Sequence, residues 1–308
     1  MKVIDFYKKR WIFFGISIAI FVIGIIMAFV NGVQLDINFK GGSILKYNYT
    51  GELDANKAAD IASSIVNRAV STQITTDLRT GEKRLIINIS GNYGLDAKIQ
   101  KSLDEALKTE FPDADLKLSE SSMVEPFFGR RFLRNGIMAI LIASFFVVIY
   151  VWIRFKKIGG LSAGIMALVA LLHDILIVFF TCVIFKIPIG DSFVAVALTI
   201  IGYSINDTIV IYDRIRENRK LYSKLPLEEV TNLSITQSMS RSINTSVAVF
   251  ISITVVYVLA FANSIEAIQG FALPMAMGTI SGCYSSVCIA ETLWVMWNRR
   301  KVRVQKNS

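Results

Sequence analysis

The sequence predicts an α-helical membrane protein with six transmembrane helices and one extracytoplasmic α+β domain. Three observations lead to this fold class. Of the 308 residues 53% are hydrophobic, and many of them form uninterrupted apolar runs. Runs of about 20 residues are long enough to cross a bilayer as helices. A polar stretch at 31–130 separates the first run from the other five, and basic residues cluster in alternate loops.

Residues 1–30 predict a cytoplasmic N-terminus followed by an uncleaved transmembrane helix. Basic residues up to Arg10 precede an apolar run from Trp11 to Val30. This order resembles a secretory signal peptide. However, the run is long enough to span the membrane, and no small-residue cleavage site follows it.

Residues 31–130 predict a domain with the ferredoxin-like order βαββαβ. The expected strands are 43–49, 73–78, 83–90 and 115–122, and the expected helices are 54–69 and 95–110. Apolar residues recur every three or four positions in the helices, and Leu85, Ile87 and Ile89 alternate as in a half-buried strand. The domain has no catalytic constellation and no aromatic–basic patch that would indicate nucleic-acid binding.

Five further spans are expected within residues 131–298, before a basic cytoplasmic tail at 299–308. They are 133–153, 159–184, 191–212, 243–262 and 267–297. With six spans, both termini are cytoplasmic and the polar domain lies outside. The charges agree, because the cytoplasmic segments hold seventeen Lys and Arg residues and the two short outer loops hold only Lys186. After Pro226 we expect a short helix along the membrane surface, leading into the fifth span.

The fourth span carries the strongest functional signal, Asn206 and Asp207 within an apolar run. An ionised carboxylate inside a bilayer costs about 2.5–3.5 kcal/mol on insertion scales, so such a residue indicates a functional site. Helical spacing predicts one polar stripe that includes both residues and Asp213. Asp213 is close enough to the basic end to be a solvated residue instead. Arg241, at the inner end of the antiparallel fifth span, is either a positive-inside anchor or the partner of Asp207.

Two other groups of residues stand out in the spans. His173 and Asp174 are adjacent in the third span and form either a hydrogen-bonded core pair or a secondary polar site. Gly278, Gly282 and Ser286 recur at four-residue steps in the sixth span. Small residues at this spacing predict a face that packs closely against another helix.

The sequence lacks the motifs of several enzyme classes. It contains no GxxxxGK[ST] nucleotide loop, no HExxH and no nucleophile elbow. Its single histidine excludes a multi-histidine metal centre, and its three cysteines have neither metal-ligand nor disulfide spacing. We therefore expect no enzymatic activity, no cofactor and no metal. An ion gradient would be the energy source, and a protonatable Asp beside an Arg favours H⁺ over Na⁺.

Five motifs in chain order resemble those of the SecD/SecF family of protein-export membrane proteins, part of the resistance–nodulation–division superfamily. They are FKGGS after the first span, LLHD in the third, GYSINDTIVIYDRIREN in the fourth, RSINTS at the fifth and SGCYSS in the sixth. The resemblance implies a subunit that works with SecD and the Sec translocation channel on unfolded preproteins. It would use the proton motive force late in translocation. Asp207 and Arg241 would form its proton relay, with Asn206 and Asp213 nearby.

A proton-driven exporter of small molecules or lipids from the same superfamily is the alternative. The resemblance implies twelve spans and two outer domains for such an exporter, so this chain would have to work as an oligomer. A passive channel scaffold would need no carboxylate at membrane depth. Co-purification with SecD and the channel, or with further copies of the chain, distinguishes the first two functions.

Overall fold

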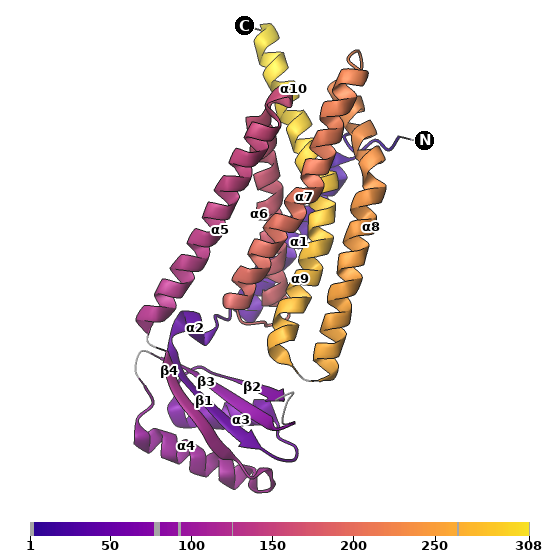
Figure 1. Ribbon diagram of the computed structural model, residues 1–308. Helices are drawn as coiled ribbons and strands as arrows, with labels where there is room; N and C mark the ends of the chain where they lie inside the picture. The colour runs from indigo at the N-terminus through magenta and orange to yellow at the C-terminus, as the bar shows by residue number, and fades with distance from the viewer. Residues whose placement is uncertain (1–2, 77–80, 92–93, 125, 264, 308) are drawn as a thin grey trace.

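The computed structural model describes residues 3–76, 81–91, 94–124, 126–263 and 265–307 as a helical bundle with a small α/β domain at one end (Figure 1). Within these residues, six helical stretches are long and apolar enough to cross a membrane, which is the predicted number. They are α1 (Arg10–Asn31), α5 (Pro126–Arg154), α6 (Gly160–Ile184), α7 (Asp191–Leu221), α8 (Leu227–Ala262) and a last stretch made of α9 (Glu266–Ser285), the π-helix η3 (Ser286–Ala290) and α10 (Glu291–Asn307).

The small domain contains a four-stranded antiparallel sheet with two helices against it. Its elements are β1 (Gly42–Tyr49), α3 (Ala55–Val66), β2 (Val70–Thr76), β3 (Lys83–Ser90), α4 (Ala97–Glu110) and β4 (Lys117–Val124). The strand order is β2-β3-β1-β4, so β1 is central and β2 and β4 are the edges. This order of strands and helices along the chain is the one that the sequence predicts, and each boundary lies within three residues of its expected place.

Local signals in the sequence explain where the two helices of the small domain begin. Asp54 precedes α3, and its carboxylate accepts hydrogen bonds from the backbone N–H groups of Asn56 at 2.9 Å and Lys57 at 3.4 Å. Asp96 does the same for α4 by accepting from the N–H of Lys98 at 3.1 Å. Such N-caps satisfy backbone donors that have no partner within the helix.

The core of the small domain lies between one face of the sheet and the helices α3 and α4. Side chains from all these elements are fully buried there, and they include Leu45, Tyr47, Leu85, Ile87, Ala58, Ala62, Leu103 and Leu107. The strand residues among them alternate with more exposed neighbours, as expected for a sheet with one covered face. Three short helices complete the chain, α2 (Ile37–Lys40), η1 (Pro112–Ala114) and η2 (Lys156–Ile158).

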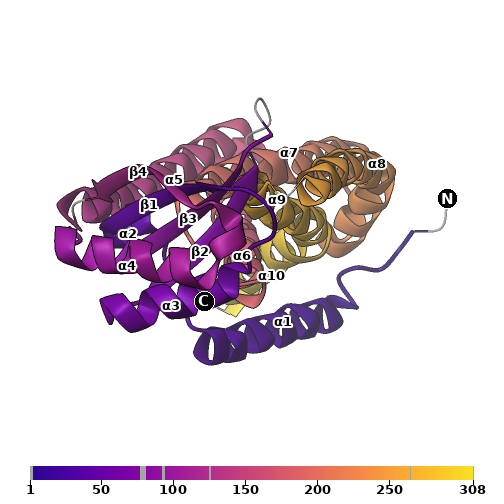
Figure 2. The same cartoon turned by 90° about the horizontal axis from the view of Figure 1, so that it is seen from below.

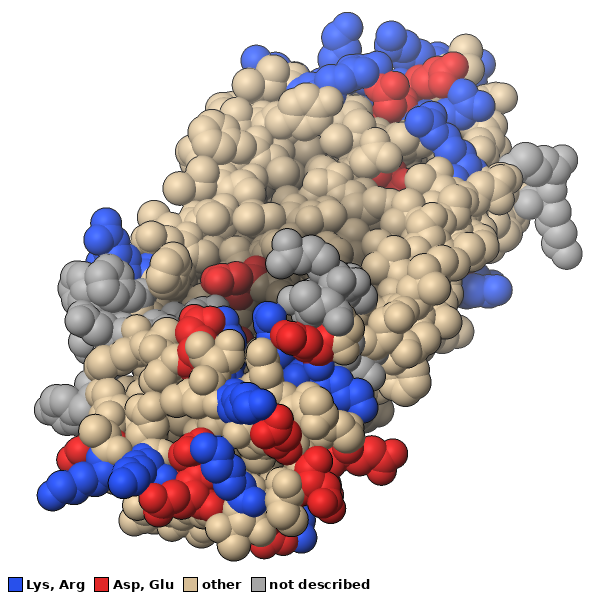
Figure 3. Space-filling view, turned by 60° about the horizontal axis from the view of Figure 1, so that its bottom comes forward, with Lys and Arg blue, Asp and Glu red and all other residues tan. Residues whose placement is uncertain are grey.

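The bundle places α6, α7 and α9 inside and leaves α1, α5 and α8 with broad apolar outer faces. α1 lies at one edge against α6, and α7, α8 and α9 lie together on another side (Figure 2). In space-filling view a mostly uncharged band separates the mixed charges of the small domain from a cluster of Lys and Arg at the far end of the molecule (Figure 3). We call these two ends of the bundle the domain end and the basic end.

The prediction of a separate surface helix after Pro226 is wrong. α8 is one continuous helix of 36 residues from Leu227 to Ala262, and α7 also extends beyond its expected end to Leu221. The polar side chains in the first part of α8 find partners within the protein rather than at a lipid surface. Asn218 of α7 donates to Ser234 Oγ at 2.9 Å, and Asn232 Oδ1 accepts from the backbone N–H groups of the N-terminal segment.

We predict that residues 31–130 fold without the spans, because their core is made from their own elements. The isolated fragment should be soluble and should unfold cooperatively on heating, as followed by circular dichroism. Leu103→Ala, at a fully buried position on α4, should lower its free energy of unfolding by about 2–5 kcal/mol.

Ile99→Ala on the same helix is the matched control, because the Ile99 side chain is 36% exposed. Ile99→Ala should lower the free energy of unfolding by about 1 kcal/mol or less. A fragment that is disordered, or equal losses in the two variants, would contradict an independent core.

Candidate functional site

Asp207 lies on α7 where this helix packs against α8 and α9. Its side chain is only 4% exposed, and its Oδ2 atom is buried without a hydrogen-bond partner among the described residues. Ser242 Oγ of α8 is buried and unpartnered in the same way, and it lies beside the Asp207 carboxyl group. Cys283 of α9 faces Asp207 from the third helix. One oxygen of the carboxyl group therefore makes no hydrogen bond of normal geometry, and the Ser242 hydroxyl is a donor within reach of it.

Arg241, the expected partner of Asp207, lies on α8 next to Ser242 and is exposed. The guanidinium and the carboxyl group are close enough to interact electrostatically. Even so, the salt bridges among the described residues include none between these two side chains. In this conformation the two charges are neighbours and not a contact pair.

Asn206 and Asp213 do not join Asp207 in one polar stripe. Asn206 is exposed on the outer surface of α7, although it is adjacent to the buried Asp207 in sequence. Consecutive residues of a helix differ by about 100° in direction, which is enough to place one inside and the other outside. Asp213 accepts from Arg154 of α5 at 3.1 Å and forms an ion pair with Arg216 at 2.5 Å. It therefore links α5 to α7 at the basic end.

Asp174 of α6 has the opposite environment, since its fully buried carboxyl group has four hydrogen-bond donors. Ser281 Oγ donates to Oδ1 at 2.6 Å, and His173 Nδ1 lies 3.1 Å from the same oxygen. Ser204 of α7 and Ser285 of α9 each donate to Oδ2 at 2.7 Å. Both oxygens are thus satisfied, and the carboxylate joins three spans.

His173 extends this network to the first span. Its Nε2 lies 3.1 Å from Ser17 Oγ of α1, and Ser17 Oγ lies 3.3 Å from the hydroxyl of Tyr284. That hydroxyl donates to the backbone carbonyl of Phe13 at 2.6 Å. We call the set Ser17, His173, Asp174, Ser204, Ser281, Tyr284 and Ser285 the Asp174 network. It ties together α1, α6, α7 and α9.

The small residues of the sixth span lie against α7. A Cβ atom on Gly282 would approach Ser204 Cβ to 3.1 Å, and one on Gly278 would approach the Ile200 side chain to 2.7 Å. Ser286 donates to the backbone carbonyl of Ser204 at 3.1 Å. This close approach of α9 to α7 places the serines of both helices within hydrogen-bond distance of the Asp174 carboxylate.

Glu291 is a candidate residue that the sequence analysis missed. It follows η3 directly, its side chain is fully buried, and neither carboxyl oxygen has a hydrogen-bond partner among the described residues. The signal was present, because Glu291 is an acidic residue in an otherwise apolar stretch. Its position eight residues before Arg299 makes it resemble the ordinary polar end of a span.

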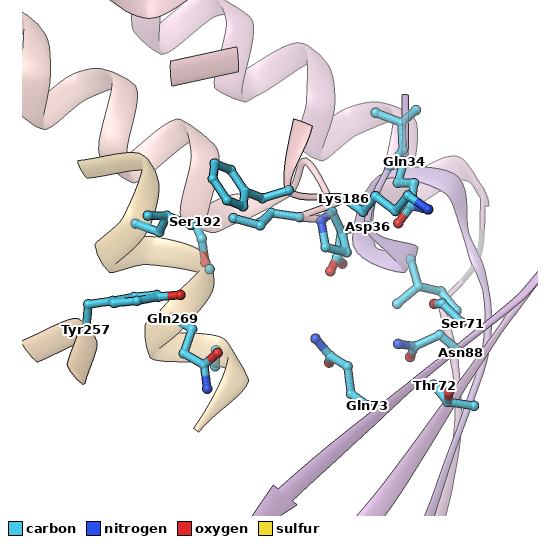
Figure 4. A pocket seen from close by; sticks show the side chains of 18 residues that line it. Gln34, Asp36, Ser71, Thr72, Gln73, Asn88, Lys186, Ser192, Tyr257 and Gln269 are labelled. Carbon is cyan, nitrogen blue, oxygen red and sulfur yellow. The ribbon is translucent and has the colours of Figure 1, made fainter. Parts of the chain in front are cut away.

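A polar cleft of about 470 Å³ lies between the small domain and the domain end of the bundle (Figure 4). Gln73 of β2 and Gln269 of α9 extend into it from opposite walls, and Tyr257 of α8 also lines it. Because these side chains line one cleft, the domain ends of α8 and α9 border the same space as β2. Beside the cleft, the backbone N–H of Ile189 donates to the carbonyl of Gln34 at 2.8 Å.

Together, the fold and these buried carboxyl groups define a multi-pass membrane protein with ionisable residues inside its helical bundle. The family model described as protein export membrane protein SecD/SecF, C-terminal, matches residues 104–300. The protein translocase subunit SecF of Alicyclobacillus acidocaldarius is 34% identical over 298 residues, which cover 96% of this chain and 92% of that protein. The chain belongs to the SecD/SecF family, which confirms the resemblance inferred from its motifs.

Two longer proteins show a similar relationship over part of their length. The protein translocase subunit SecDF of Bacillus subtilis is 34% identical over 304 residues, covering 97% of this chain and 39% of the longer protein. The crystal structure of SecDF from Thermus thermophilus, described as a translocon-associated membrane protein, superposes with a TM-score of 0.76 at 26% identity. The match covers 97% of this chain and 39% of that structure.

We predict that Ser285→Ala destabilises the bundle by about 1.5–3 kcal/mol, because it removes one of the four donors to a buried carboxylate. Thermal unfolding of the purified protein in detergent measures this loss. Ser252→Ala is the control, since the exposed Ser252 hydroxyl donates only to a carbonyl of its own helix at 2.9 Å. Equal stability of the two variants would show that the hydrogen bonds to the Asp174 carboxylate do not stabilise the bundle.

Proposed function

We propose that this chain is the SecF-type half of a proton-driven membrane complex that promotes a late stage of preprotein translocation. SecD would be the other half, and the Sec channel and the unfolded preprotein would be the further partners. The family membership supports protein export. The SecDF relatives support a two-half complex, because they contain a region similar to this chain and are more than twice as long.

The observation that carries the proton-coupling part is the buried Asp207 carboxyl group with an unpartnered oxygen. An ionised carboxylate in a low-dielectric interior is costly unless it has a cation or several donors, whereas a protonated one is neutral. Loss of the proton from Asp207 would attract Arg241 of α8, and gain of a proton would release it. Proton binding would thereby be coupled to the position of α8 relative to α7.

The polar cleft supports transmission of this movement to the small domain. Tyr257 of α8 and Gln269 of α9 border it on the bundle side, and Gln73 borders it on the side of β2. A shift of the two helices at their domain ends would therefore act on the sheet. We propose that the small domain, a ferredoxin-like unit, moves in this way and contacts the preprotein.

The proposed orientation places the basic end in the cytoplasm and the small domain outside the bacterial cytoplasmic membrane. Figure 1 shows both chain ends at the end of the bundle opposite the small domain, and Lys and Arg cluster there in Figure 3. Cytoplasmic loops of membrane proteins carry an excess of these residues. The proposed parts of the chain are the cytoplasmic N-terminus with the first span at 1–30, the extracytoplasmic domain at 31–130, the other five spans at 131–298 and the basic cytoplasmic tail at 299–308.

The outer face of α7 supports an interface with SecD. Gly202 and Asn206 are both exposed, and apart from the adjacent part of α7 no atom of the described residues lies within 4 Å of a Cβ built on Gly202. The two residues are four positions apart and share one helix face. Small and amide residues in a span favour close contact with another helix, since an amide needs a hydrogen-bond partner in lipid.

We predict that Asp207→Asn abolishes the stimulation of export by a proton gradient. The amide is nearly isosteric but cannot exchange a proton, so folding and SecD binding should persist. The measurement is movement of a preprotein into sealed membrane vesicles, with and without an imposed gradient. ATP-driven movement without the gradient should stay within about twofold of wild type.

Asp191→Asn is the matched control, because Asp191 is exposed in the first turn of the same helix. This variant should keep the full stimulation by the gradient. Equal stimulation in wild type and Asp207→Asn would rule out the relay and leave Asp207 with a structural role.

We predict that Gly202→Leu reduces co-purification with SecD at least several-fold, because the added side chain fills the open face of α7. Gly15→Leu is the matched control, since Gly15 of α1 is an exposed helical glycine that also has no atom within 4 Å of its Cβ position. If neither variant alters co-purification, this face is not the interface. If the chain purifies only with copies of itself, the exporter alternative gains support.

A further inference from the structure

Glu291 lies deep in the bundle, at the start of α10. It is eight positions before Arg299, which corresponds to about 12 Å of helix. Its side chain is fully buried beside an aromatic pair, Tyr212 and Trp294, whose ring centroids lie 5.8 Å apart. The preceding helical segment, η3, is a π-helix, a distortion that often occurs at functional sites.

Among the described side chains, no Lys or Arg forms an ion pair with the Glu291 carboxyl group. The ionisable groups that interact with it electrostatically are Asp207 and Tyr212 of α7 and Cys288 of η3. The ionisable residues on the other helices that pack against this region have the following partners. His173 and Asp174 of α6 belong to the Asp174 network, and Glu228 of α8 pairs with Arg299. Arg10 of α1 donates through Nη1 to the carbonyl of Tyr7, and its buried Nε has no partner among the described residues.

An unpaired ion in this position would be strongly disfavoured. The effective cost of burying a charge in a protein is several kcal/mol, and hydrogen bonds to the charge are what normally offset it. Neither oxygen of Glu291 accepts a hydrogen bond from another of the described residues. Trp294 Nε1, one turn further along α10, is also a buried donor without a partner there. The site thus contains polar groups that the surrounding side chains do not satisfy.

A cavity of about 490 Å³ brings the basic end close to this site. Arg299 and Arg300 line it, and so do Met166 and Leu293 on the inner side. Met166 belongs to the apolar cluster that contains Tyr212 and Trp294, and Leu293 packs against that cluster. Met166 and Leu293 are therefore shared between the lining of the cavity and the apolar cluster around Glu291's aromatic neighbours.

We propose that Glu291 is a second proton-binding group of the bundle, which exchanges a proton with the basic end and with Asp207. In the step between the two residues, the O–H bond at the Glu291 carboxyl group breaks and an O–H bond at the Asp207 carboxylate forms, directly or through water. The total charge of the pair does not change. Two interacting carboxyl groups cannot both ionise cheaply, so they share protons as a unit. The exchange with Asp207 rests on the proposed function, whereas proton binding by Glu291 does not.

The test is infrared spectroscopy of the full-length protein in lipid vesicles as the pH is varied, because the C=O absorption of a protonated carboxylic acid is distinct from that of a carboxylate. At neutral pH we expect a protonated-acid band that is lost in Glu291→Gln and declines in wild type as the pH rises. Glu217→Gln should keep the band, since Glu217 is exposed and forms an ion pair with Arg214 at 2.6 Å. Glu291→Asp keeps a carboxyl group and should shift the band rather than remove it.

Two spectroscopic results would overturn proton binding. If no protonated-acid band of Glu291 is present at any pH, the carboxyl group is always ionised. If the band stays constant at all pH values, the carboxyl group is a neutral acid that does not exchange its proton. Asp207→Asn should keep the band and change its pH midpoint, and an unchanged midpoint would overturn the exchange with Asp207.

Export in sealed vesicles separates this inference from the proposed function. Glu291→Gln should reduce the stimulation by a proton gradient several-fold, and unchanged stimulation would overturn its role in transport. If Asp207→Asn keeps full stimulation, the proposed function fails, while a Glu291 band that titrates still establishes the second proton-binding group.

Discussion

The bundle depends on a single constraint, the burial of the Asp174 carboxylate. Inside a membrane, polar groups must find their partners within the protein. Here three serine hydroxyls and one imidazole meet the carboxylate oxygens, and they come from α6, α7 and α9. Serine side chains are short, so this arrangement requires helices that approach closely. Gly278 and Gly282 permit that approach, and for this reason the small-residue face of α9 and the Asp174 network depend on each other.

The three buried carboxyl groups differ in how completely the protein satisfies them. Asp174 has donors at both oxygens, Asp207 has one buried oxygen without a partner, and Glu291 has two. A fully bonded carboxylate fixes the helices around it. An incompletely bonded one is costly when ionised, and a proton relieves that cost. The same chemical group therefore holds the bundle together in one position, and in others its surroundings suit the proton exchange that we propose.

The sequence predicted those features that depend on local patterns. Apolar runs predicted the six spans, helical periodicity and strand alternation predicted the order of the small domain, and the charge within an apolar stretch indicated Asp207. The remaining features depend on contacts between distant segments. The direction of Asn206, the continuous α8 and the donors of Asp174 are set by packing, and Ser281 and Ser285 lie more than 100 residues from Asp174 in sequence. Glu291 was not predicted as a site residue because the basic segment that follows it makes it resemble the polar end of a span.

The distribution of these contacts indicates which helix can respond to a proton. The Asp174 network fastens α1, α6, α7 and α9 to one another, and α8 contributes no residue to it. The hydrogen bonds between described side chains of α7 and α8 are that of Tyr203 with Ser246, at 2.8 Å, and those of Arg214 with Gln237 and of Asn218 with Ser234 and Gln237. α8 carries Arg241 near Asp207 and Tyr257 at the cleft. In the proposed function, a change of charge at Asp207 would therefore act on α8, which contributes no residue to the Asp174 network and borders the cleft beside the small domain.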